Sequence, residues 1–148
     1  MDAKLNVLLI GGGGREHALA WKLKQSPRLG RLFAAPGSAA ILQLAEPLNA
    51  AVEDAAALTQ ACRDQSVHLV MIGPEQPLAE GLADTLRAAG LKVFGPGKLG
   101  AELEASKDFS KRFMHRHGVA TAQAFDQDGN HVALGDTVSW EVAVAGHI

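Results

Sequence analysis

A run of glycines near the start of the sequence has the chemistry of an anion-binding loop. The run consists of Gly11, Gly12, Gly13 and Gly14, and it is followed by Arg15 and Glu16 at the start of a helical pattern. Backbone N–H groups in the first turn of a helix have no partner within the helix, and the helix dipole is positive there. Glycines let the main chain approach a phosphate without obstruction by side chains. The loop therefore predicts a phosphate site, although a tight turn without a ligand has the same composition.

This loop fits neither of two common nucleotide-binding motifs. A Walker A loop requires a Lys-Ser or Lys-Thr pair after its last glycine, and none follows here. A dinucleotide fingerprint requires a third glycine where Glu16 stands, and no Asp or Glu lies between Glu16 and Glu46 to bind the ribose hydroxyls. NAD is therefore disfavoured. A cofactor with a 2′-phosphate stays a possible ligand, because Arg31 could bind that phosphate. A phosphorylated sugar fits better, because it needs the phosphate cradle but no clamp for an adenosine ribose.

Glu75 is a second candidate binding residue. It follows Gly73 and Pro74 directly after an apolar segment, where a carboxylate suits sugar hydroxyls or an amine. A carboxylate that only stabilises the start of a helix is the alternative, and both interpretations stay open. We expect no metal site. His115 and His117, two residues apart, cannot face the same side of a helix, and the segment 126–130 has its glycine at the wrong place for a calcium loop.

Strand-like and helix-like segments alternate over the first hundred residues and must position these groups. The expected strands cover residues 5–10, 32–35, a short stretch around Leu48, 67–72 and 92–94. The expected helices cover residues 15–25, 54–63 and 78–89. This alternation is typical of right-handed βαβ units, so we predict an α/β fold with an open, Rossmann-like parallel sheet flanked by helices. Ligands bind beyond the carboxyl ends of such strands, so the Gly/Pro segments 11–14, 73–77 and 95–97 should converge on one crevice.

The pattern changes after Phe94. Residues 99–104 and 107–117 are expected to form helices, with Ser106 as an N-cap and Gly118 as a C-terminal stop. Turn dipeptides then flank two short β-rich pieces, residues 132–134 and 137–144. We therefore expect a short β-rich tail without a helix at the end of the chain.

Composition excludes several classes of protein. The 148 residues are 47% hydrophobic and 20% charged, which is typical of one globular domain and not of a disordered segment. A lone cysteine, Cys62, favours a reducing compartment, and we expect a cytoplasmic protein. The net charge of −2 disfavours nucleic acid as a partner. The apolar run before the glycines is too short to span a membrane, so no membrane partner is expected.

Two long stretches carry a family resemblance, namely GGREHALAWKL and ELEASKDFSKRFM. Shorter matches stand in order around them: AAPG, VMIGPEQPL, VFGPGKLGA and HGVATA. With these motifs, the first 122 or so residues resemble the N-terminal domain of phosphoribosylamine–glycine ligase (glycinamide ribonucleotide synthetase). The resemblance implies a pre-ATP-grasp domain at residues 1–104 and a connecting helix at 105–122 that leads towards an ATP-grasp domain. The family joins phosphoribosylamine to glycine in de novo purine biosynthesis, with ATP and magnesium.

The resemblance also implies roles for individual residues, while it leaves the catalytic residue unknown. The implied substrate-binding residues are Gly11, Gly12, Gly13, Gly14, Arg15, Glu16, Pro36, Gly37, Gly73, Pro74 and Glu75. Within this set, the four glycines would hold the phosphate, Arg15 and Glu16 would shape the loop, and Glu75 would approach the ribosylamine. Lys107 matches a position that contacts nucleotide phosphates in ATP-grasp relatives, although a solvated helix lysine is the alternative.

The sequence departs from the family in two places. Ser38-Ala39-Ala40 follows AAPG where the family has Asn, which puts one sugar contact in doubt. Residues 123–148 match nothing in the family, and no Lys or Arg occurs after Arg116. We therefore expect that the ATP-grasp domain is absent, that the ATP and magnesium sites are largely missing and that the truncated chain has no ligase turnover alone. The alternatives are a non-catalytic phosphoribosyl-binding module that works with a separate ATP-grasp chain and, third, a nucleotide-cofactor oxidoreductase.

Overall fold

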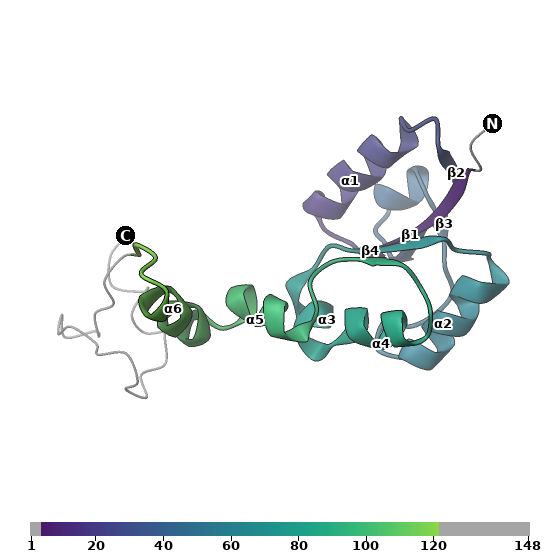
Figure 1. Cartoon of the computed structure of the whole chain (residues 1–148). Coiled ribbons are helices and arrows are strands. Elements are labelled where there is room, and N and C mark those ends of the chain that lie inside the picture. The colour runs from purple at the N-terminus through teal and green to yellow at the C-terminus, as the bar shows by residue number, and fades with distance from the viewer. Residues whose placement is uncertain (1–3, 122–148) are drawn as a thin grey trace. The chain divides into compact units, whose positions relative to one another are not determined.

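The computed structural model describes residues 4–121, which divide into two compact units after Ala101. The first unit is a parallel α/β structure, shown with its elements labelled in Figure 1. The expected β-rich tail at residues 123–148 lies outside the described residues, as does the segment 126–130. Within residues 4–121, none of the helices has the length and apolar character needed to cross a membrane.

Five parallel strands form the sheet in the order β3-β2-β1-β4-β5. The strands are β1 (Leu5–Gly11), β2 (Leu29–Pro36), β3 (Glu46–Pro47), β4 (Leu69–Ile72) and β5 (Val93–Phe94). Strand β1 occupies the centre because its apolar run is buried on both faces, as a parallel strand between two layers of helices requires. The predicted α/β fold with an open parallel sheet is therefore confirmed.

Helices cover both faces of this sheet. The helices of the first unit are α1 (Gly14–Lys24), the short 3-10 helix η1 (Ile41–Gln43), α2 (Ala55–Asp64), α3 (Glu75–Glu80) and α4 (Leu82–Ala88). In Figure 1, α1 lies on one face, and α2, α3 and α4 lie on the other. Successive residues of β1 point to opposite faces, so Leu9 packs in the core beside α1 while Leu8 packs in the core beneath α2 and α4.

The helix boundaries correct one prediction and confirm another. The expected single helix at residues 78–89 is wrong, because α3 ends at Glu80 and α4 begins at Leu82. Gly81 between them has a left-handed backbone (φ +97°) that interrupts the helix. Helix α3 also begins earlier than expected, at Glu75. The expected helix start at Asp54 is confirmed, since its carboxylate accepts the N–H groups of Ala56 and Ala57 at 3.1 and 2.9 Å.

Helix α5 (Lys98–Ala105) spans the division between the units, and α6 (Lys107–Arg116) belongs to the second unit. Ser106 caps α6 as predicted, because its hydroxyl accepts the N–H of Phe109 at 3.2 Å. The ring of Phe113 packs against that of His117, with the centroids 4.4 Å apart. Asp108 and Arg112 form an ion pair one turn apart on the same helix.

Candidate functional site

The carboxyl ends of β1, β2 and β4 bring three loops together. Ile10 of β1 is in register with Ala35 of β2 on one side and with Ile72 of β4 on the other. Just beyond these pairs, the Gly73 N–H donates to the Ile10 carbonyl oxygen at 3.1 Å. Residues 11–14 therefore lie between residues 36–37 and 73–75. The structure thus places together segments that lie about 60 residues apart in the sequence.

Glu16 lies beneath this group of loops and is 5% exposed. Its Oε2 accepts the Gly13 N–H at 2.8 Å, so the side chain of the first helical turn reaches back to the loop. A Cβ atom at Gly73 would lie 2.2 Å from Glu16 Oε1, and a Cβ at Gly11 would lie 2.6 Å from Glu16 Cγ. A side chain at either position would therefore have to displace the Glu16 side chain, and the positive φ of Gly11 (+124°) favours glycine there as well.

The exposed rim of the crevice is formed by the start of α1 and by Arg15. Gly12 and Gly14 are exposed, and a Cβ at Gly14 would meet no other atom within 4 Å. The Arg15 guanidinium crosses to the neighbouring loop, where its Nη1 donates to the Gly73 carbonyl oxygen at 2.9 Å. A cation and the positive end of α1 thus lie side by side, an arrangement that stabilises a bound anion.

The second loop contacts the glycine run directly. A Cβ at Gly12 would lie 2.8 Å from the Gly37 carbonyl oxygen, so the two main chains touch at this point. Pro36, the last residue of β2, is in register with Gly11. Ser38 begins the turn into η1, and its carbonyl oxygen accepts the Leu42 N–H at 2.8 Å. The main chain of this loop therefore closes one side of the crevice.

The third loop carries Pro74 and Glu75. Pro74 precedes α3, and Glu75 is the first residue of that helix and is exposed. Glu75 stands at the carboxyl end of β4 and also at a helix start, so its position is compatible with a binding role and with a helix-stabilising role. Gly95, which follows β5, packs beside this loop, because a Cβ there would lie 2.9 Å from Leu78 Cδ2 and 3.8 Å from Ile72 Cβ. The turn after β5 is therefore next to the end of β4, as the sequence predicts.

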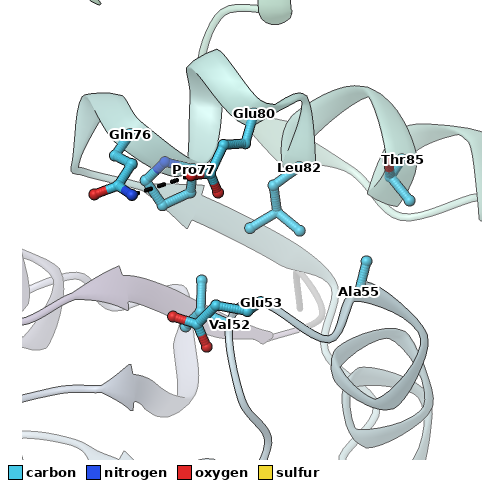
Figure 2. Close-up of a pocket in the computed structure, with 8 residues that line it drawn as sticks. All are labelled: Val52, Glu53, Ala55, Gln76, Pro77, Glu80, Leu82 and Thr85. Atoms are coloured by element: carbon cyan, nitrogen blue, oxygen red, sulfur yellow. Dashed lines mark hydrogen bonds between the residues drawn. The ribbon is translucent and has the colours of Figure 1, made fainter.

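A separate pocket of about 240 Å³ lies between the start of α2 and the helices α3 and α4, as Figure 2 shows. Its lining residues are Val52, Glu53, Ala55, Gln76, Pro77, Glu80, Leu82 and Thr85. Gln76 Nε2 donates to Glu80 Oε1 at 3.0 Å. The two carboxylates disfavour a phosphate in this pocket, and none of the predicted site residues lines it. Sequence reasoning missed these residues, because no motif links the start of α2 with α3.

Of two other candidate residues, Arg31 lies apart from the crevice and Lys107 belongs to the second unit. Arg31 is near the amino end of β2, where its Nε donates to Glu46 Oε1 at 3.1 Å and its Nη1 donates to Gln65 at 3.0 Å. The hydrogen bond from Arg31 holds the pKa of the Glu46 carboxyl below its ordinary value. Arg31 therefore offers no 2′-phosphate contact at the glycine loop. Lys107 is the first residue of α6 and is exposed in the second unit.

Solved structures of other proteins share this fold. The biotin carboxylase domain of a single-chain bacterial carboxylase matches 82% of the chain with a TM-score of 0.59 at 19% identity, and the match covers 30% of that protein. The biotin carboxylase domain of a thermophilic 2-oxoglutarate carboxylase, solved with bicarbonate, also has a TM-score of 0.59, at 18% identity. At this level of identity, the likeness shows the arrangement of strands and helices alone.

Curated proteins found by sequence are much more similar to this chain than these solved structures are. Trifunctional purine biosynthetic protein adenosine-3 of Gallus gallus is 54% identical over 119 residues, which cover 79% of this chain and 12% of that protein. Phosphoribosylamine–glycine ligases of Mesorhizobium japonicum and Haemophilus influenzae are 50% and 48% identical over 80% of the chain. The chain spans 28% of the length of each of these two ligases.

The family model described as "Phosphoribosylglycinamide synthetase, N domain" matches residues 5–104. This range contains the whole parallel sheet and the three loops at its carboxyl edge. The expected resemblance is therefore confirmed, and the chain belongs to the family of the phosphoribosylglycinamide synthetase N domain.

Proposed function

We propose that the crevice binds phosphoribosylamine, with its phosphate at the start of α1 and its ribosylamine towards Glu75. The observation that carries this proposal is the group of three loops assembled over Glu16. A phosphate at Gly12–Gly14 faces exposed main chain and the positive end of α1. Arg15, held on the Gly73 carbonyl, adds a cation at the rim. Membership of the family supports the same substrate.

Glu75 is suited to the opposite end of the substrate. An exposed carboxylate at the end of β4 accepts hydrogen bonds from ribose hydroxyls or from the amine, whereas it repels the phosphate. The main chain at Pro36, Gly37, Gly73 and Pro74 then borders the sugar. Placing the anion and the amine at opposite ends gives the bound molecule one orientation, which is the main contribution that a binding domain makes to a ligation.

We further propose that the chain supplies the sugar-phosphate half of an ATP-dependent ligase. ATP would supply the phosphoryl group that activates the carboxylate of glycine for attack by the amine. Among residues 4–121, no group of three or more His, Cys, Asp or Glu residues could hold a metal ion. Exposed Lys107 is a candidate contact for nucleotide phosphates.

The 148 residues are expected to have no ligase turnover alone, because they span 28% of the length of the ligases from Mesorhizobium and Haemophilus. An ATP-grasp chain or domain would then be the partner that completes the cytoplasmic enzyme. ADP release that depends on both glycine and phosphoribosylamine, measured with the purified chain, would contradict this expectation.

An amide-resolved NMR titration with ribose 5-phosphate tests the binding proposal, because this compound is a stable substitute for the sugar-phosphate part of phosphoribosylamine. We expect shifts centred on residues 11–16 and 73–75. Ribose without a phosphate, ATP and NAD serve as control ligands. A well-dispersed spectrum that does not change with ribose 5-phosphate would overturn the proposal.

Gly14→Asp sharpens this test. The substitution has room, since no atom beyond the adjacent residues and the backbone of α1 lies within 4 Å of the new Cβ, and an acidic residue stabilises the start of a helix. It nevertheless adds a negative charge where the phosphate is proposed to bind, so the affinity should fall about tenfold, equivalent to roughly 1.4 kcal/mol. Ala56→Asp is the matched control, because Ala56 is exposed in the first turn of α2. Equal affinities of the two variants would argue against a phosphate at α1.

A further inference from the structure

Two charged residues of α4, Asp84 and Arg87, hold the turn between β5 and α5. Arg87 Nη2 donates to the carbonyl oxygens of Val93, at 3.2 Å, and of Gly95. Asp84 Oδ2 accepts the N–H of Lys98, the first residue of α5, at 2.8 Å. The two side chains also face each other, with Arg87 Nη1 3.5 Å from Asp84 Oδ1. Both ends of the turn are therefore attached to the same helix.

The turn packs closely against Asp84. A Cβ atom at Gly97 would lie 2.6 Å from Asp84 Oδ1, so the main chain of the turn touches the carboxylate. Asp84 also acts as an N-cap for α5 although it comes from a different helix, 14 residues earlier in the sequence. The path of residues 95–98 is thus set by Asp84 and Arg87 of α4. The residues that determine the shape of the turn therefore lie outside the turn itself.

The place of this turn links it to the crevice. Strand β5 runs parallel to β4, and Gly95 packs against Ile72 and Leu78. Ile72 directly precedes Gly73. The Gly73 carbonyl oxygen accepts a hydrogen bond from the Arg15 guanidinium, and Gly73 lies beside the Glu16 side chain. A displacement of the turn would therefore be transmitted to the loop that carries Pro74 and Glu75.

We propose that Asp84 and Arg87 are positioning residues that set the affinity of the crevice for a sugar phosphate through the turn at residues 95–98, without contact to the ligand. The proposal rests on the proposed function of the crevice. The Asp84–Arg87 ion pair is exposed, with 54% and 38% of the side chains accessible, so it contributes little to stability. The contacts to main-chain N–H and C=O groups instead fix the geometry of the turn, and small displacements of binding groups weaken binding.

Three variants of the full chain test this role in the ribose 5-phosphate titration. Asp84→Ala and Arg87→Ala should each weaken binding about fivefold, the effect of losing a hydrogen bond that holds the turn. They should also shift the Gly95 and Lys98 amide resonances in the absence of ligand. Arg87→Lys keeps the positive charge but cannot donate to two carbonyls in the planar geometry of Arg, so it should resemble Arg87→Ala.

Arg63→Ala is the matched control. Arg63 Nη2 donates to the Ala89 carbonyl oxygen at 3.1 Å, so this variant also removes an arginine–carbonyl contact from the end of α4, outside the turn. It should leave both the affinity and the resonances of residues 95–98 unchanged. Unaltered spectra elsewhere in the sheet verify that each variant is folded.

The outcomes separate the two proposals. If the wild-type chain binds ribose 5-phosphate and the α4 variants bind equally well, the positioning role is overturned while the function of the crevice stands. If Arg87→Lys binds like the wild type and Arg87→Ala does not, charge and not geometry sets the affinity, and the positioning role is again overturned. If the wild-type chain itself does not bind, the proposed function fails and the role of the turn in binding fails with it.

Discussion

The Glu16 side chain connects the start of α1 with the end of β4. It is buried, its Oε2 holds the Gly13 N–H, and its methylene and carboxylate groups occupy the space beside Gly11 and Gly73. A dinucleotide-binding loop has its third glycine at this position, where close packing of the helix on the sheet leaves no room for a side chain. Here the Glu16 side chain occupies the space beside Gly11 and Gly73.

Replacing Glu16 should destabilise the first unit. Glu16→Ala leaves the Gly13 N–H without its acceptor and opens a void, which should lower the free energy of unfolding by about 2 kcal/mol. Glu16→Gln retains an acceptor oxygen and nearly the same volume, so its loss should be smaller. Denaturant unfolding measures the loss of stability in both Glu16 variants, and Glu53→Ala, at an exposed position, is the control. A Glu16→Ala midpoint equal to that of the control would show that the side chain does not hold the loop.

Cys62 provides a pH-dependent prediction. Its thiol is in the core, and burial raises its pKa to about 11. The free energy of unfolding should not depend on this group below the pKa of about 8.5 of an exposed thiol. Above that pH, the unfolded chain ionises while the folded chain resists ionisation, so stability should fall until the pH passes about 11.

Two measurements test whether the Cys62 thiol is buried and resists ionisation. Folded protein at neutral pH should react with a thiol reagent much more slowly than the unfolded chain, because only the accessible thiolate reacts. In unfolding experiments, Cys62→Ala should lack the alkaline component of the pH dependence. Rapid labelling of the folded chain would mean that Cys62 is accessible.

At the scale of elements, Gly81 separates α3 from α4. Its φ of +97° is unfavourable for residues with a side chain, although space around it is available, since a Cβ atom there would lie 3.6 Å from its nearest neighbour, Lys98 Cδ. Gly81→Ala should therefore lower the free energy of unfolding by about 1 kcal/mol through backbone strain alone. Gly14→Ala, in a helical position with open space, should be neutral or stabilising. Equal stabilities of the two variants would contradict the strain argument.

The elements also show what the sequence could and could not predict. The apolar run of β1 and the glycines after it predict a buried strand and a loop at its carboxyl end, because these signals are local. The break at Gly81 was missed because a single glycine is tolerated in a helix, and its left-handed backbone is decided by the packing of α3 and α4. Asp84 and Arg87 were not found either, because their partners at residues 93–98 depend on how α4 lies against the turn.

At the scale of the whole molecule, residues 4–101 form one core on each face of a single sheet. Leu8, at the centre of β1, is fully buried, whereas Leu99 of α5 is 79% exposed. Leu8→Ala should therefore lower the free energy of unfolding by about 3 kcal/mol, and Leu99→Ala should have little effect. Thermal unfolding of the two variants measures the difference. Similar losses would mean that Leu99 is covered in solution.

The packing of Glu16 against Gly73 has a consequence for how this sequence can vary. A side chain at position 73 would displace the Glu16 carboxylate, and a shorter side chain at position 16 leaves a void, so we expect each change to be destabilising by itself. The two changes together compensate in volume, which makes their effects strongly non-additive. Among related sequences, positions 16 and 73 should therefore covary, and an evolutionary path that altered one of them would pass through a less stable intermediate unless the other had already changed.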